Sequence, residues 1–205
     1  MRKHTISSIK KQDGFTIVEL LFATTVFTLV LLVAATGFLQ VTRIYYRSVI
    51  TSRTQDITRT VVDDVAQAIQ FNAGSVQSSI DTGSGDLEAL CVGSVRYNIN
   101  LGQQITSSAD RAMVRDNGAG SAGCVQAADS DGTELLGSQM RLHSFAVNQV
   151  GDTSAYNIRV RVIYGDDDLI DGLNSDNPVC TGLRFGGQFC AVSELNTTVT
   201  RRIRN

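Results

Sequence analysis

The sequence has few of the residues and motifs that enzymes commonly use for catalysis. Its 205 residues include only two histidines, His4 and His143, and no G-x-S-x-G segment. If the first fourteen residues are removed, as argued below, one histidine remains, which excludes a metal site with two histidine ligands. His143 lies in a segment with strand-like alternation, where a structural role is expected. We therefore do not expect an enzyme.

Lysine is absent beyond Lys11, and this absence divides the chain by composition. The first fourteen residues hold four basic side chains and one acidic one: Arg2, Lys3, Lys10, Lys11 and Asp13. The rest holds 14 basic and 19 acidic residues, a net charge of −5. Such a balance gives no reason to expect a nucleic-acid binder. The opening segment is a basic leader on an acidic protein.

Charge is missing altogether from Leu20 to Thr42. These 23 positions form a helix of roughly 35 Å at about 1.5 Å per residue, which is enough to cross the apolar core of a bilayer. Because four leader charges outnumber Arg43 and Arg47, we expect the N-terminus to stay in the cytoplasm and the chain beyond about residue 45 to be translocated.

A small-residue cleavage site of the secretory type is missing after the apolar run, whereas Gly14 precedes the run. The alternative is a signal anchor that is never cut. Glu19 argues against that alternative, because a carboxylate one turn inside an apolar helix needs a partner. Cleavage after Gly14 would supply one: the new amine of Phe15, from the same chain or from a neighbouring subunit.

The segment Lys10–Leu21, KKQDGFTIVELL, resembles the prepilin signature of type IV pilins and of the pseudopilins of type II secretion. The resemblance covers about the first forty residues. It implies cleavage between Gly14 and Phe15 by a prepilin peptidase, which also N-methylates Phe15. It further implies that Glu19 neutralises the amine of an adjacent subunit. Major pilins commonly have a helix-bending proline late in the span, where this chain has Thr36-Gly37.

The chain is expected to have four parts. Residues 1–14 form the leader, residues 15–42 the transmembrane and filament-core helix, residues 43–73 its amphipathic continuation, and residues 74–205 an extracytoplasmic β-rich head. The amphipathic part is indicated by a stripe of apolar residues at helical spacing, opposite a face of arginine and aspartate. The stripe comprises Ile57, Val61, Val62, Val65, Ala66, Ile69 and Phe71; the polar face comprises Arg53, Asp56, Arg59, Asp63 and Asp64.

Alternating segments after Gly74 predict strands. Tyr156–Tyr164 alternates most clearly, and Met140–Val150 is its expected hairpin partner through Gly151-Asp152. Segments 90–101 and 191–203 are two further strand candidates. The predicted fold is therefore α+β, with a long N-terminal helix packed on an antiparallel sheet, as the pilin family has.

The four cysteines contain no C-x-x-C pair, so one or two disulfides are favoured over a metal or redox site. Cys180–Cys190 would close a short C-terminal loop and would leave Cys91–Cys124 by elimination. The sequence alone confirms neither pairing.

Three other motifs are weaker. The acidic loop offers calcium candidates in Asp166, Asp168 and Asp171, and major pseudopilins bind calcium in a C-terminal loop, but the EF-hand spacing is absent and a solvated loop is favoured. The G-x-G-x-x-G match at 118–123 lacks the flanking strand and helix of a cofactor site. The C-terminal arginines, Arg201, Arg202 and Arg204, have no stacking aromatics nearby, so DNA binding is not favoured.

These features together predict a structural subunit of a type IV pilus-like filament, and a minor one. A type II secretion pseudopilin and an adhesin or DNA-binding tip pilin are the alternatives. Expected partners are other pilin or pseudopilin subunits, the prepilin peptidase, the inner-membrane assembly platform with its ATPase, and membrane lipid before assembly. No cofactor is expected beyond the calcium candidate. The protein should be a single-pass cytoplasmic-membrane protein that then enters an extracellular or envelope filament.

Overall fold

The computed structural model describes residues 14–80, 87–118, 123–127, 132–181 and 187–202. It divides into two compact units, residues 1–43 and residues 44–205, which are treated separately below. The second unit is called the head here. The predicted leader, residues 1–14, lies outside the described residues except for Gly14.

One helix, α1 (Ile17–Phe71), accounts for 55 residues and passes from the first unit into the head. The threonine hydroxyls in its first part are satisfied within the helix, because they donate to backbone carbonyls one turn earlier. Thr24 donates to Leu21 (3.0 Å) and Thr25 to Phe22 (2.8 Å). The helix continues through Gly37 without a break.

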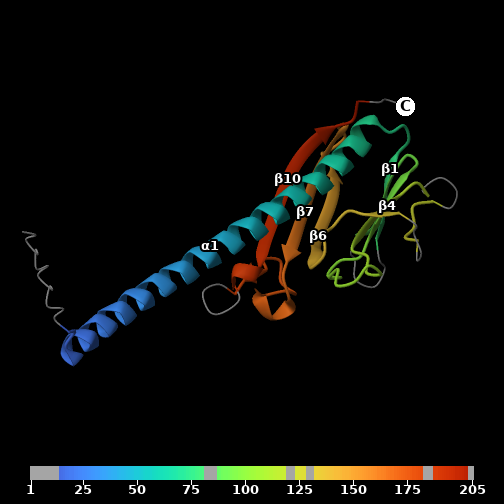
Figure 1. The fold of residues 1–205 in the computed structure, drawn as a ribbon. Helices are drawn as coiled ribbons and strands as arrows, with labels where there is room; N and C mark the ends of the chain where they lie inside the picture. Colours follow the sequence, from blue (N-terminus) through green and yellow to red (C-terminus); the bar gives the residue numbers. More distant parts are fainter. Residues whose placement is uncertain (1–13, 81–86, 119–122, 128–131, 182–186, 203–205) are drawn as a thin grey trace, which may run out of the picture. The chain divides into compact units, whose positions relative to one another are not determined.

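The head contains one five-stranded, one three-stranded and one two-stranded antiparallel sheet among its described residues. The first has the order β1-β2-β3-β4-β5: β1 (Val76–Ile80), β2 (Leu87–Val92), β3 (Val95–Ile99), β4 (Met113–Asp116) and β5 (Thr133–Glu134). The second has the order β10-β7-β6: β6 (Met140–Gln149), β7 (Ala155–Tyr164) and β10 (Ala191–Thr200). The third pairs β8 (Ile170–Asp171) with β9 (Val179–Cys180), and two short 3-10 helices, η1 (Asp167–Leu169) and η2 (Gly187–Phe189), flank it in the chain. Figure 1 shows the head part of α1 beside β10, β7 and β6.

The hairpin predicted from alternation is confirmed. β6 pairs with β7 from Met140↔Tyr164 to Gln149↔Tyr156, with a bulge at His143. β10 adds to the other side of β7 and begins at the predicted residue, Ala191. These ten-residue strands carry the clearest period-2 pattern in the chain, which explains why sequence alone located them.

The single strand predicted at 90–101 is wrong, because the chain turns back at Gly93 and forms the β2–β3 hairpin. Gly93 has a φ of +62°, and a Cβ there would lie 2.2 Å from the carbonyl oxygen of Ala73. Only glycine fits both the left-handed backbone and this approach to the end of α1. Apolar residues continue on both sides of the turn, so the hydrophobic pattern gives no sign of it.

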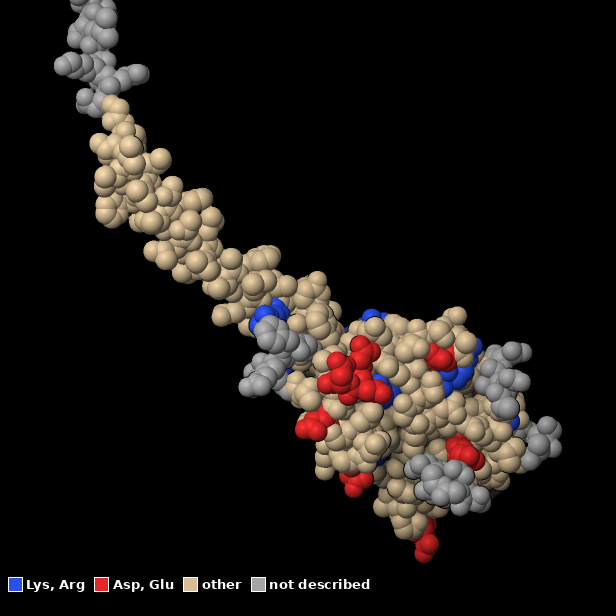
Figure 2. All heavy atoms as spheres, turned by 90° about the horizontal axis from the view of Figure 1, so that it is seen from below, with Lys and Arg blue, Asp and Glu red and all other residues tan. Residues whose placement is uncertain are grey.

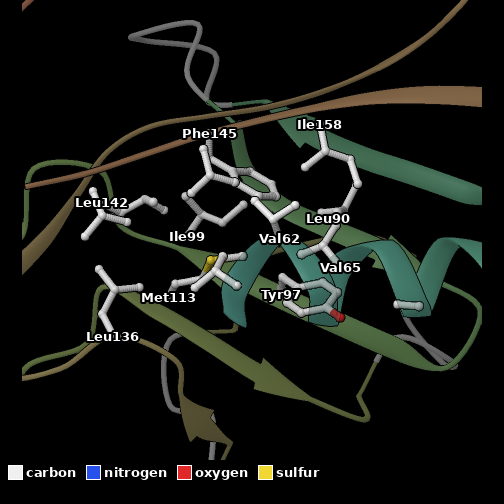
Figure 3. Close-up of a cluster of buried hydrophobic side chains, with 14 of the residues drawn as sticks. Val62, Val65, Leu90, Tyr97, Ile99, Met113, Leu136, Leu142, Phe145 and Ile158 are labelled. Atoms are coloured by element: carbon white, nitrogen blue, oxygen red, sulfur yellow. The ribbon is translucent and has the colours of Figure 1, made fainter. Parts of the chain in front are cut away.

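The core of the head lies between the helix and both larger sheets. Val62 and Val65 of α1 point toward Leu90 and Tyr97 of the five-stranded sheet and toward Ile158 of the three-stranded one (Figure 3). The predicted apolar stripe is confirmed at Val61, Val62, Val65 and Ile69, all fully buried. Each such burial stabilises the fold by about 1.5–3 kcal/mol.

The stripe differs from the prediction at its two ends. Phe71 is 52% exposed, so its place in the core was wrong. Toward the N-terminus the buried face continues through Thr58 and Thr54, whose hydroxyls donate to the carbonyls of Thr54 (2.7 Å) and Ile50 (2.8 Å). A threonine satisfied in this way packs like a valine, which a pattern restricted to apolar residues misses.

Candidate functional site: the N-terminal turn and the head that anchors it

The first turn of α1 is capped by Thr16. The backbone N–H of Glu19 donates to the Thr16 hydroxyl (3.3 Å), and the N–H of Leu20 donates to the Thr16 carbonyl (3.2 Å). Threonine at the N-cap with glutamate three residues later is the capping-box spacing. The T-x-x-E signal of Thr16–Glu19 is visible in the sequence and predicts this cap. The helix therefore starts two residues after Gly14-Phe15, the expected processing site.

Glu19 lies in the first turn with its side chain exposed, and no described residue forms an ion pair with it. The positive end of the helix dipole favours a carboxylate at this position. Phe15, whose amine would become the N-terminus after cleavage, is 76% exposed and precedes Glu19 by one turn. The turn thus combines an exposed acid with the site where a new positive charge would appear.

The helix around this turn is apolar on every side. Every residue from 14 to 41 is exposed, and the most apolar window of α1 has a mean hydropathy of 2.4 with none of it buried. By length and composition α1 is able to cross a membrane. A helix that is hydrophobic all round needs lipid or other helices as its surroundings.

A buried tyrosine, hydrogen-bonded to an aspartate that is itself ion-paired, joins α1 to the five-stranded sheet within the head. The Tyr97 hydroxyl donates to Asp64 Oδ2 (2.8 Å), and Arg115 Nε lies 3.5 Å from the same oxygen. Burial and the bond to Asp64 raise the pKa of Tyr97 well above its ordinary value. Asp64, predicted on the polar face of the helix, is half-buried, because the sheet covers it.

The C-terminal arginines contact the end of the same helix. The Arg202 N–H donates to the Gln70 carbonyl (3.2 Å), and the Arg202 guanidinium lies 5.4 Å from the centre of the Phe71 ring. The Arg201 guanidinium donates to the Gly74 carbonyl. Arg204 lies outside the described residues. The two described arginines thus have structural partners, and the DNA-binding alternative stays a prediction.

Two disulfides hold the head, with the pairing favoured from the sequence. Cys91 and Cys124 join β2 to a later loop with a Cα–Cα distance of 5.6 Å. Cys180 and Cys190 close the loop before β10 with a Cα–Cα distance of 5.7 Å. Both lie in the part of the chain expected outside the cytoplasm, where disulfides persist.

The acidic loop around η1 shows no metal-site geometry. Figure 2 shows one larger group of acidic side chains and several smaller ones on this face of the head. Within the described ranges, no three histidine, cysteine, aspartate or glutamate side chains converge as a metal site would require. Asp166 accepts from Gln104 (3.2 Å), and Asp167 pairs with the buried Arg141 (2.5 Å). Asp168 and Asp171 are exposed. Calcium binding at Asp166, Asp168 and Asp171 stays a prediction.

His143 has the structural surroundings expected of it. Its Nε2 lies 3.0 Å from the Ser175 carbonyl oxygen, and the side chain is half-buried at the β6 bulge. Burial, followed by the charges of Arg161 and Arg141, lowers the pKa of His143. Most of the glycine-rich segment at 118–123 lies outside the described residues; Gly118 donates its N–H to Asp116 in a turn.

Comparison with known proteins agrees with the geometry of the first turn. Residues 9–35 match the family model described as the prokaryotic N-terminal methylation motif, which is the signal of type IV pilins and pseudopilins. The motif and the apolar helix together support a membrane-anchored, pilin- or pseudopilin-like protein that assembles with other such subunits. No curated protein and no solved structure matches the chain.

Proposed function

We propose that this protein is a minor structural subunit of a type IV pilus-like filament, cleaved after Gly14 and assembled through α1. The observation that carries the proposal is the exposed carboxylate of Glu19, directly before the uncharged segment Leu20–Thr42 of α1 and inside the methylation motif. The 191 residues that would remain after cleavage are more than a typical major pilin has. In size the chain resembles the larger minor pilins and the J-type pseudopilins, which favours a minor over a major subunit.

Processing comes first in the proposed sequence. The leader holds the N-terminus in the cytoplasm, and a prepilin peptidase cleaves between Gly14 and Phe15 and methylates the Phe15 amine. The exposure of both residues and the helix start at Ile17 support an accessible, non-helical cleavage site. Methylation keeps the amine cationic, so it remains an ion-pair partner for a carboxylate.

Assembly then pairs the Phe15 amine of an incoming subunit with Glu19 of the subunit beside it. An unpaired carboxylate in the membrane costs up to about 2.5–3.5 kcal/mol at mid-depth and less near the interface. The incoming amine removes that cost only in the correct register. An assembly platform and its ATPase would supply the work of extraction, and the apolar helices would pack in the filament core.

The test is quantitative mass spectrometry of surface filaments sheared from the native host, together with its membranes. We expect chains that begin at N-methylated Phe15, present in the sheared fraction at a small proportion of the main subunit. The same processed chains confined to the membrane fraction would instead support a secretion pseudopilin. An intact leader in both fractions would overturn the proposal.

A further inference from the structure

We infer that, before assembly, the head rests on a zwitterionic lipid surface through three aromatic side chains. Tyr45 and Tyr46 belong to α1, and Phe189 belongs to η2; we call these three the aromatic patch. All belong to the head unit. The inference rests on the membrane insertion that is part of the proposed function.

The aromatic patch is continuous and open to solvent. The Tyr46 ring centre lies 6.1 Å from that of Tyr45 and 6.1 Å from that of Phe189. The exposed fractions are 66% for Tyr45, 49% for Tyr46 and 45% for Phe189. Residues 143 positions apart in the chain thus form one exposed aromatic surface.

Phe189 is held in this position by the core beneath it. Its neighbour Cys190 is 3% exposed, is bonded to Cys180, and packs against Ile163 and Ile170. A Cβ at Gly165 would lie 2.9 Å from the Phe189 carbonyl oxygen, so glycine is needed for this approach. These contacts hold the Phe189 backbone in place, so the ring stays on the surface.

Chain connectivity places the aromatic patch at the bilayer surface. Thr42 is the last residue of the uncharged run, and Tyr46 follows it by four residues, or about 6 Å along a helix. Each headgroup layer is about 5–8 Å thick, the difference between a core of about 30 Å and a bilayer of about 40–45 Å. Tyrosine concentrates in this layer, because its ring has an apolar body and a polar end.

Among the described residues, the charges near the aromatic patch indicate which lipid suits it. Arg43 and Arg47 flank the two tyrosines and reach lipid phosphates through long apolar stems. Negative charge lies near the same loop that carries Phe189. The Thr181 N–H donates to the Leu169 carbonyl (2.8 Å), which brings the acidic η1 segment close to the Cys180–Cys190 loop. Exposed aspartates there, such as Asp168, repel anionic headgroups, so a neutral phosphocholine-type surface fits best.

The absence of tryptophan from the chain provides a direct test. Full-length Phe189→Trp is reconstituted in phosphatidylcholine vesicles, with and without lipid brominated near the top of the acyl chain. Phe38→Trp in the span serves as the inserted control, and Phe71→Trp, exposed at the other end of α1, as the control away from the bilayer. Mass spectrometry of the disulfides and circular dichroism check folding; Tyr46→Trp replaces Phe189→Trp if that variant misfolds.

We expect quenching of Phe189→Trp to reach at least half that of Phe38→Trp, and Phe71→Trp to stay unquenched. Adding Tyr45→Ser should reduce quenching of Phe189→Trp about twofold. If Phe38→Trp is quenched and Phe189→Trp behaves like Phe71→Trp, the inference is wrong while membrane insertion stands. If Phe38→Trp is itself unquenched, insertion and the proposed function fail together. A Phe189→Trp emission shift that appears without quenching and disappears as lipid is added would identify a second copy as the occupant, and would also overturn the inference.

Discussion

Under the proposed function, Glu19 has opposite consequences before and after assembly. In the single chain, the helix dipole stabilises the Glu19 carboxylate in the capped first turn, but no described cation pairs with it. In the proposed assembly, the unpaired carboxylate is unfavourable in lipid, whereas an ion pair with the amine of a neighbouring subunit would fix the register of the two helices. Variants at this position should therefore separate insertion from assembly.

We predict that Glu19→Gln lowers incorporation into filaments at least tenfold while its membrane level and leader cleavage stay at wild-type values. Glutamine keeps the shape and removes the charge that pairs with the Phe15 amine. Quantitative mass spectrometry of sheared and membrane fractions measures this, with Asp63→Asn, an exposed acid of the head, as the control. Wild-type incorporation of Glu19→Gln would contradict the ion-pair role.

His143 predicts a pH effect with a definite sign. Because the folded state lowers its pKa below the ordinary value of 6.5, the unfolded chain binds more protons around that pH. The free energy of unfolding should then decrease as pH falls through 6.5 toward the folded-state pKa. After leader removal His143 is the only histidine, so a single imidazole NMR signal reports it. A midpoint at or above 6.5 would refute the prediction; His143→Gln should remove this part of the pH dependence.

The elements differ in how far sequence could predict them. α1 and the strands β6, β7 and β10 follow from long periodic patterns, and the structure bears them out. β1, β4 and β5 are short segments of two to five residues whose pairing depends on distant strands, so local pattern gives no signal. The motif at Gly14-Phe15 and Glu19 could be read directly, whereas the Asp64–Tyr97–Arg115 contact exists only through packing.

The head part of α1 should be essential to the stability of the head. Ile69 is fully buried in the shared core, so Ile69→Ala should lower the free energy of unfolding by about 2–5 kcal/mol. Ile80→Ala removes the same side chain from a 57% exposed position in β1 and should change it by less than about 0.5 kcal/mol. Urea unfolding in detergent micelles measures both; equal losses would show that the helix face does not form the core.

At the scale of the whole head, the two disulfides stabilise regions of different kinds. Cys180–Cys190 supports the loop that carries Phe189, and Cys91–Cys124 joins the five-stranded sheet to a later loop. The Cys180–Cys190 bond restricts the unfolded chain and so raises the free energy of unfolding by about 2–4 kcal/mol.

We predict that the double variant Cys180→Ala/Cys190→Ala loses about 2–4 kcal/mol of unfolding free energy, seen as a lower urea midpoint, yet keeps the Cys91–Cys124 bond. It should also reduce quenching of Phe189→Trp by brominated lipid, because the ring loses its support. Thiol mapping by mass spectrometry verifies the remaining bond. An unchanged unfolding midpoint would show that the loop is held by its apolar neighbours alone.

The contact between Arg202 and the Gln70–Phe71 end of α1 has a consequence for engineering the protein. This contact places the end of β10 beside the end of α1. Phe71 follows Tyr46 by 25 residues, about 37 Å of helix. A fluorescent reporter or affinity handle inserted at Arg202 would therefore branch from the Phe71 end of α1, away from the aromatic patch.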